Sequence, residues 1–307
     1  MKKNIALFLA LPFSLSISAK TIDLTPPFGN ANKIEFFYSD FPSGDRSISA
    51  ILATSEYPGK TITIANICDP EGGDAMIGNL ATVGRNSTHG DILAITCIYK
   101  LRHTGIGIIG TQYQAKIFEK TEEILRKSIS EEELLSGFEG QSENGDASFY
   151  FYKNPELFRE KLRLITEGKE SDSLELTHAI AIETLEKNSA KTAGNYLSEG
   201  LIKSLFNNHP LTKKNAPLYN DIGYVLVEAK KMEQALTILL PIKEVAPNRI
   251  PLYLNIADAY WPTQKEIAKK YYEKYQTLML KKDKREQIPE RVKIRTTKET
   301  LKNASRT

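Results

Sequence analysis

The hydrophobic pattern of the first half of the chain is that of β-strands. Between residues 20 and 113, short β-branched or aromatic runs are separated by Pro and Gly turn signals. Residues 61–64 alternate strictly as Thr-Ile-Thr-Ile, which predicts a strand with one face in a core. Helices are predicted at 115–127 and 131–137, and because they do not alternate regularly with strands, a small sandwich is expected. The predicted strands span 34–38, 47–54, 61–68, 91–101 and 147–152.

From residue 154 the apolar positions change to the period of helices. Asn154 followed by Pro155 is typical of a helix cap and a first-turn proline. The chain is therefore expected to be an α+β protein, with a β-rich, sandwich-like domain before a helical one. The predicted helices span 155–168, 173–187, 191–207 and part of 286–301. The predicted segments are a signal peptide at 1–19, a β-rich domain with helical insertions at 20–152, a helical domain at 154–280 and a basic tail at 281–307.

Residues 216–280 contain one helical hairpin twice, 34 positions apart. The first copy has Tyr219, Ile222, Gly223, Leu226, Ala235, Leu239 and Pro247. The second has Tyr253, Ile256, Ala257 and Tyr260 in the same slots and, after a one-residue deletion, Ala268, Tyr272 and Tyr275. This spacing resembles the tetratricopeptide repeat, in which small residues let two antiparallel helices approach and proline ends the second helix. The chain departs from that pattern at Tyr219 and Tyr253, where tryptophan is usual, and at Ala257, where a second glycine is usual.

The resemblance implies a surface that binds another protein, without chemistry of its own. In the family, the first helices of the repeats line a concave groove, and the helices at 154–207 would cap the array as a degenerate hairpin. Aromatic residues that the repeat pattern does not place between the helices are candidates for contact with the partner. Their side chains bury a large area at a small cost in conformational entropy. The candidate partner-binding residues are Asn220, Tyr224, Asn255, Asp258, Trp261 and Tyr271, with Asp221 and Lys230 as neighbours. An ordinary surface role is the alternative for each of them.

The first nineteen residues have the features of a signal peptide. Lys2 and Lys3 precede an apolar run at 5–15, and Ser18 with Ala19 would form the small-residue cleavage site. An uncleaved membrane anchor is the alternative, but the apolar run is shorter than the roughly 20 residues that a span needs. Export to the periplasm is therefore expected, with release outside the cell as the second choice.

Cys68 and Cys97 are the only cysteines of the chain, and each falls in a predicted strand. In an oxidising compartment, neighbouring strands would permit one disulfide, and two buried thiols are the alternative. We expect no metal at the pair, because no histidine or further cysteine lies at ligand spacing.

Positive charge is concentrated at the end of the chain. The net charge is +3, and residues 281–307 carry ten Lys or Arg against four Asp or Glu. We interpret this tail as a solvated terminus, with weak contact to an anionic surface as the alternative. Nucleic acid is not an expected partner, because the basic run lacks interleaved aromatic residues.

Two motifs could indicate chemistry. Gly105, Gly107 and Gly110 follow the G-x-G-x-x-G spacing of dinucleotide loops, but no βαβ alternation surrounds them. We interpret them as glycines that let a strand bend or pack closely, and expect no cofactor. Residues 69–74 gather three carboxylates in a glycine-bearing loop, but the spacing does not match a calcium loop and a solvated turn is expected.

The sequence therefore predicts a noncatalytic periplasmic scaffold that binds a protein of the cell envelope through a groove. One concrete version is an immunity-type inhibitor of a toxin delivered to the periplasm. No residue is assigned a catalytic or metal-binding role. The alternative is an envelope hydrolase with its site in the β-rich domain, for which the candidate residues are Asp69, Glu71, Asp74 and His89.

Overall fold

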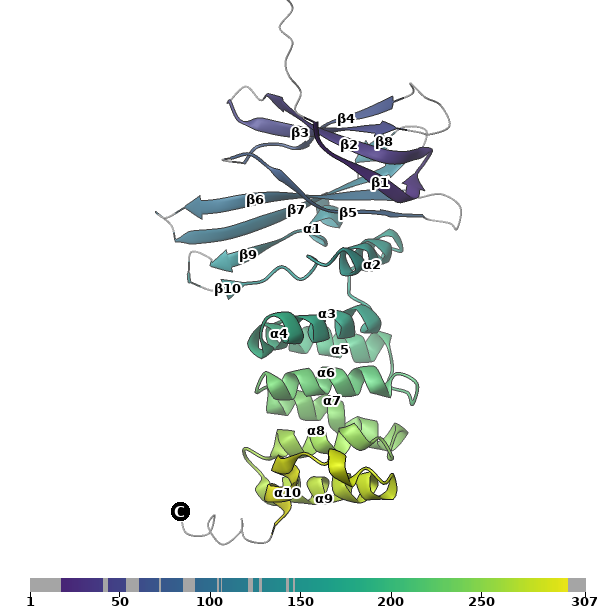
Figure 1. Ribbon diagram of the computed structural model, residues 1–307, viewed down its shortest axis with the longest axis vertical. Helices are drawn as coiled ribbons and strands as arrows, with labels where there is room; N and C mark the ends of the chain where they lie inside the picture. The colour runs from purple at the N-terminus through teal and green to yellow at the C-terminus, as the bar shows by residue number, and fades with distance from the viewer. Residues whose placement is uncertain are drawn as a thin grey trace, which may run out of the picture. The chain divides into compact units, whose positions relative to one another are not determined.

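The chain is an α+β protein, with β-sheets in its first part and helices in its second (Figure 1). It divides into two compact units between Glu167 and Gly168. The helix α2 (Pro155–Thr166) packs on a strand of the first unit, so the units divide one helix later than the predicted domains. The structure is a computed structural model, and it describes residues 18–40, 44–53, 61–71, 73–84, 92–103, 105, 107–120, 124–126, 129–141, 144–145 and 147–297.

The first sheet is antiparallel, with its strands in chain order. It contains β1 (Ser18–Phe28), β2 (Ala31–Asp40), β3 (Arg46–Ala53) and β4 (Thr61–Cys68). The last three confirm the strands predicted at 34–38, 47–54 and 61–68. Strand β1 was not predicted from the sequence; it contains two consecutive prolines, and its pairing with β2 is irregular between Asp23 and Phe28.

The second sheet has the order β10-β9-β7-β6-β5, with β8 also paired to β7. Its strands are β5 (Met76–Val83), β6 (Ile92–His103), β7 (Ile108–Lys120), β8 (Ile124–Arg126), β9 (Gly137–Gln141) and β10 (Ala147–Ser148). The helix predicted at 115–127 is wrong, because residues 115–120 continue β7, which pairs with β6, and residues 124–126 form β8. The strand predicted at 147–152 is confirmed only for the two residues of β10.

Strand β6 is apolar on both faces because each face enters a different core. Leu93, Ile95, Cys97 and Tyr99 pack with side chains of the first sheet, so the two sheets share one apolar cluster. Ile92 and Ala94 point into a second cluster with Phe158 and Leu162 of α2. A strand covered on both sides has a nearly continuous apolar sequence, and β6 confirms the strand predicted at 91–101.

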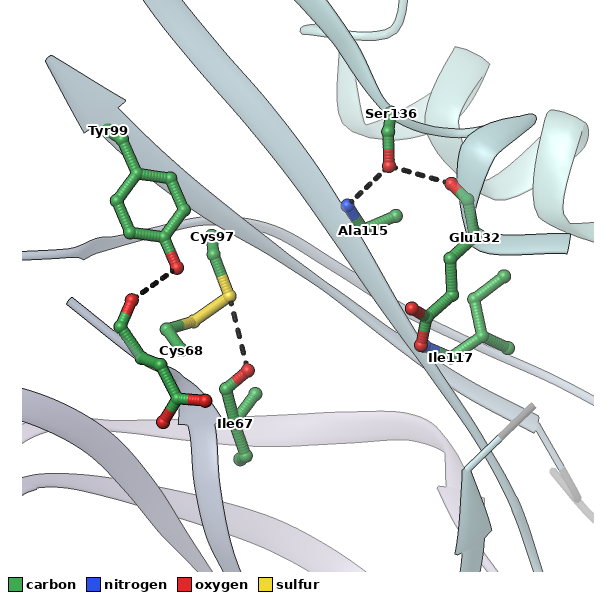
Figure 2. Close-up of a disulfide and its surroundings, with 9 residues drawn as sticks. Ile67, Cys68, Cys97, Tyr99, Ala115, Ile117, Glu132 and Ser136 are labelled. Atoms are coloured by element: carbon green, nitrogen blue, oxygen red, sulfur yellow. Dashed lines mark hydrogen bonds between the residues drawn. A yellow bond between two sulfur atoms is a disulfide. The ribbon is translucent and has the colours of Figure 1, made fainter. Parts of the chain in front are cut away.

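A disulfide joins the two sheets. Cys68 ends β4 in the first sheet and Cys97 lies in β6 of the second, with their Cα atoms 5.6 Å apart and both side chains fully buried (Figure 2). Beside it, the Tyr99 hydroxyl donates a 2.8 Å hydrogen bond to the backbone oxygen of Asp69. The structure therefore has the disulfide, and not the two buried thiols that were the alternative from the sequence.

The short helix α1 (Ile129–Glu133) completes the hydrogen bonding of β7. Between the stretches that pair with β8 and β9, the N–H of Ala115 donates to Ser136 Oγ at 2.9 Å, and that of Ile117 donates to Glu132 Oε1 at 3.1 Å (Figure 2). Buried backbone donors need partners, and here two side chains of the α1 region take the place of a strand. The helix predicted at 131–137 is confirmed only for 131–133, because α1 ends at Glu133 and Gly137 begins β9.

The second unit is helical throughout. Its elements are α3 (Leu174–Lys187), α4 (Ala190–Tyr196), α5 (Glu199–Asn208), α6 (Ala216–Glu228), α7 (Met232–Val245), α8 (Ile250–Tyr260), α9 (Lys265–Lys281), the 3-10 turn η2 (Arg285–Gln287) and α10 (Glu290–Thr296). The single helix predicted at 191–207 is wrong: the chain breaks at Leu197, and Ser198 Oγ caps α5 by accepting from Leu201 N at 3.2 Å.

Two antiparallel hairpins, α6 with α7 and α8 with α9, form the middle of this unit. The small residues of the repeated pattern lie inside them, since Gly223, Ala235, Ala257 and Ala268 are all buried. Helices α3, α6 and α8 are neighbours in that order, as Figure 1 shows. The side chains that these helices leave uncovered therefore share one surface.

Part of the predicted basic tail is folded rather than frayed. Ile288 and Val292 are buried in one cluster with Tyr272 and Met279 of α9, which holds α10 on the last hairpin. The expectation of a solvated terminus is thus wrong up to Thr297. Residues 298–307 and most of the predicted signal peptide lie outside the described residues.

Candidate functional site

Charged side chains link α3, α6 and α8 across their shared surface. His178 Nε2 of α3 lies 3.2 Å from Asp221 Oδ2 of α6, and Arg249 Nη2, just before α8, lies 3.7 Å from Asp221 Oδ1. Further along α6, Tyr224 and Glu228 follow Asp221 at helical spacing. We call the surface formed by His178, Asp221, Tyr224, Glu228 and Asp258 the α6–α8 face.

Asp221 is held in its charged form at the centre of these contacts. Burial alone would raise its pKa, but hydrogen bonds from His178 and Asn220 and the charge of Arg249 lower that pKa below the ordinary value. The carboxylate is therefore ionised at neutral pH and joins three helices electrostatically.

Tyr224 is the aromatic side chain that the face presents to solvent. Its exposed fraction is 39%, and among the described residues it is the only aromatic in the group of exposed large apolar side chains. Partial burial raises the pKa of its hydroxyl, the charge of Glu228 adds to the rise, and Arg291 opposes it. Tyr224 thus stands between an acid of its own helix and an arginine of α10.

Asp258 of α8 is the acceptor that fastens α10. Its carboxylate takes a 2.5 Å hydrogen bond from the Tyr272 hydroxyl and 2.9 Å bonds from Arg291 Nη2 and Arg295 Nη1. The guanidinium of Arg295 also lies 4.6 Å from the ring centroid of Trp261. A carboxylate with two guanidinium partners and an adjacent aromatic ring is a typical arginine-binding arrangement.

The structure brings together some of the predicted partner-binding residues and separates others. Tyr224, Asp258 and Trp261 lie on or beside the α6–α8 face. Asn220 and Asn255 are buried, with exposed fractions of 1% and 7%, so neither amide lies at a surface that a partner could contact directly. Tyr271 belongs to a separate aromatic group, stacked on Tyr260 with ring centroids 5.9 Å apart and hydrogen-bonded by Lys243.

The cations of this region were not predicted from the sequence. Arg249 contacts the face from just before α8, and Arg291 and Arg295 contact it from α10; no repeat register could assign them. The only usable signal was the i, i+4 spacing of Arg291 and Arg295 in the closing helix, which places both on one side.

The candidate acids of the β-rich unit have structural partners. Asp74 forms an exposed ion pair with Arg46, whose hydrogen bonds lower the pKa of the carboxyl. Asp69 accepts the Tyr99 hydroxyl through its backbone, and Glu71 is exposed. His89 lies outside the described residues. Within the described part of the chain, no group of three or more His, Cys, Asp or Glu is placed to hold a metal ion.

The glycines at 105–110 lie in the hairpin between β6 and β7. Gly107 has a φ of +73°, and a Cβ on Gly110 would stand 2.4 Å from the backbone oxygen of Glu139 in β9. Close packing of strands therefore explains Gly110, in agreement with the interpretation of the sequence. After Gly110 the chain continues as strand β7, whereas a dinucleotide loop requires a helix at this point.

Comparisons of the chain with family models, curated proteins and solved structures gave no match. The tetratricopeptide-like interpretation therefore rests on the residues and their geometry and stays a prediction. None of the described helices combines the length and the apolar character needed to cross a bilayer.

Proposed function

We propose that this protein is an exported, noncatalytic scaffold whose tetratricopeptide-like α6–α8 face binds a segment of another protein. The observation that carries the proposal is Tyr224, an aromatic ring 39% exposed on packed helices and surrounded by charged groups. Rings in such settings are the usual energetic centres of protein interfaces, because burying them removes much apolar area from water at a small cost in side-chain freedom.

Binding would combine burial of the Tyr224 ring with polar contacts at its border. Asp221 and Glu228 lie one turn away on either side of the ring along α6, and both can accept hydrogen bonds. The hairpins beneath are closely packed around Gly223 and Ala235, so the face needs little rearrangement on binding. A helix or an extended segment of the partner fits this mode of recognition.

Export is supported by the amino-terminal sequence and is compatible with the Cys68–Cys97 disulfide, since disulfides persist mainly in oxidising compartments. The periplasm is the location we propose. An immunity-type inhibitor that captures a toxin there is a concrete form of the proposal, supported by the export signal and by the lack of a catalytic motif in the sequence.

The experiment is capture of partners from envelope extracts by the affinity-tagged chain from Lys20. We expect Tyr224→Ala to remove the captured protein. The matched control is Ile267→Ala on α9, because Ile267 is exposed to nearly the same extent, 37%, and lies on another helix surface. Equal capture by both variants would contradict the proposal. Hydrolysis of an envelope component that is lost with Asp69→Ala and kept with Tyr224→Ala would favour an enzyme instead.

A further inference from the structure

The chain contains a segment that already binds beside the α6–α8 face. Helix α10 presents Arg291 and Arg295, one turn apart, and both donate to the Asp258 carboxylate at 2.9 Å. Val292, between them, is fully buried against the last hairpin. Helix α10 is thus held by a buried valine and by charge-assisted hydrogen bonds from an arginine on each side of it.

The surface that receives α10 is negatively charged. On α6 and α8 the face carries Asp221, Glu228 and Asp258, and Arg249 is the cation that approaches from the start of α8. Lys265 of α9 lies 5.9 Å from the ring centroid of Trp261, and the two cations that bind the Asp258 carboxylate, Arg291 and Arg295, come from α10 itself. A segment that replaced α10 would need the same charge, because without it the largely buried Asp258 carboxylate would keep only the Tyr272 hydroxyl as a donor and would have no charged partner from α10.

Two features favour arginine over lysine at this position. Asp258 accepts hydrogen bonds from both Nε and Nη2 of Arg291, at 3.3 and 2.9 Å, which a single ammonium group cannot reproduce. The guanidinium of Arg295 lies over Trp261 and Tyr272, with centroid distances of 4.6 and 5.6 Å. Planar guanidinium groups stack on aromatic rings in this way.

Helix α10 is also short enough for a helix of another protein to replace it. It has 7 residues, and helices of fewer than about 12 residues are marginal without tertiary contacts. It spans Glu290–Thr296 and follows the 3-10 turn η2 at the far end of the helical unit from α3. We expect this helix, which packs on the last hairpin, to open locally before the hairpins themselves unfold.

We propose that Asp258, Trp261 and Tyr272 form an arginine-binding dock, and that the partner presents an amphipathic helix with two arginines one turn apart that displaces α10. This rests on the proposed function and names the chemistry of the partner: a positively charged helix. The resident helix α10 lowers the apparent affinity for the partner, because it must be released first.

The test uses a fluorescent peptide with the sequence of residues 288–297 as the probe and the chain from Lys20 as the receptor. The double variant Arg291→Glu with Arg295→Glu weakens the binding of α10 to the last hairpin, because the two glutamates would face Asp258 and Glu228. Anisotropy titrations are expected to show at least tenfold tighter peptide binding by this double variant than by the wild-type chain. Adding Asp258→Asn should abolish the gain, whereas Glu244→Gln, which removes an exposed acid on α7, should leave it unchanged.

A peptide with both arginines changed to glutamate should not bind either receptor. Equal affinity for wild type and double variant, or indifference to Asp258→Asn, would overturn the proposal. So would a dimer of the wild-type chain that exchanges α10 between copies, seen by size-exclusion chromatography with light scattering.

If circular dichroism shows that the double variant is unfolded, the variant with Arg291→Gln and Arg295→Gln replaces it. Tyr224-dependent capture of a partner without binding of the arginine peptide would leave the proposed function standing and remove this inference alone.

Discussion

Gly223 of α6 lies directly against Leu239 of α7, so closely that a Cβ on Gly223 would stand 2.5 Å from Leu239 Cδ2 and 2.6 Å from its Cγ. Carbon atoms in ordinary contact are about 3.5 to 4 Å apart, so no side chain fits at this crossing. The hairpin that supports Tyr224 can close only because position 223 lacks a Cβ.

Gly223→Ala is therefore expected to destabilise the helical unit. Leu239 would have to move within a full core, which costs about 1–3 kcal/mol and exceeds the gain of up to about 1 kcal/mol from better helix propensity. Urea unfolding followed by the fluorescence of Trp261, the only tryptophan, reports on this unit. The control is Gly200→Ala in α5, where a Cβ meets nothing within 4 Å and stability should hold or rise slightly. Equal effects of the two variants would contradict the packing described here.

Removing the inter-sheet disulfide should weaken the β-rich unit. Cys68 and Cys97 enclose a sequence separation of 29, and a crosslink of that size contributes about 2–4 kcal/mol by restricting the unfolded chain. Replacing both cysteines with alanine should lower the midpoint of urea unfolding measured by circular dichroism. Dithiothreitol should produce a similar loss in the wild-type chain and none in the variant. A wild-type chain whose unfolding midpoint does not respond to reduction would refute this role.

The ion pairs of Asp221 should make the helical unit sensitive to acid. The folded-state pKa of Asp221 lies below its ordinary value of 3.8, so its stabilising contribution is fully present above that value and is lost as the pH falls through the lowered pKa. Asp221→Asn should therefore reduce the difference in the free energy of unfolding between pH 7 and pH 3. Unfolding at each pH is followed by Trp261 fluorescence. The control is Glu233→Gln on α7, because Glu233 is exposed. Superimposable pH profiles for Asp221→Asn and the wild-type chain would argue against the charge network.

Elements with a strong local signal were predictable from the sequence. The first four residues of β4 alternate strictly, and α2 is capped by Asn154, whose Oδ1 accepts from Glu156 N at 2.8 Å. Elements that depend on distant partners were not. Ala115 and Lys116 favour a helix locally, but pairing with β6 along the whole of β7 outweighs that preference.

The same distinction holds for the site. Tyr224 was predicted as a contact residue because the repeat pattern, which shows which residues pack between the helices, does not place it there. Asn220 and Asn255 are both buried, and burial of a polar side chain on a first helix is not indicated by its residue type or position in the sequence. The arginines of α10 contact Asp258 only after the closing helix folds back onto the last hairpin, which local spacing does not indicate.

Site-specific photo-crosslinking in intact cells shows whether a partner binds at the α6–α8 face. Benzoylphenylalanine is introduced at position 224 or at position 267, where the native side chains are exposed to 39% and 37%. We expect a crosslinked protein adduct from position 224 and none from position 267. Adducts from position 267 alone, or from neither position while an affinity-tagged chain still captures a partner, would contradict it.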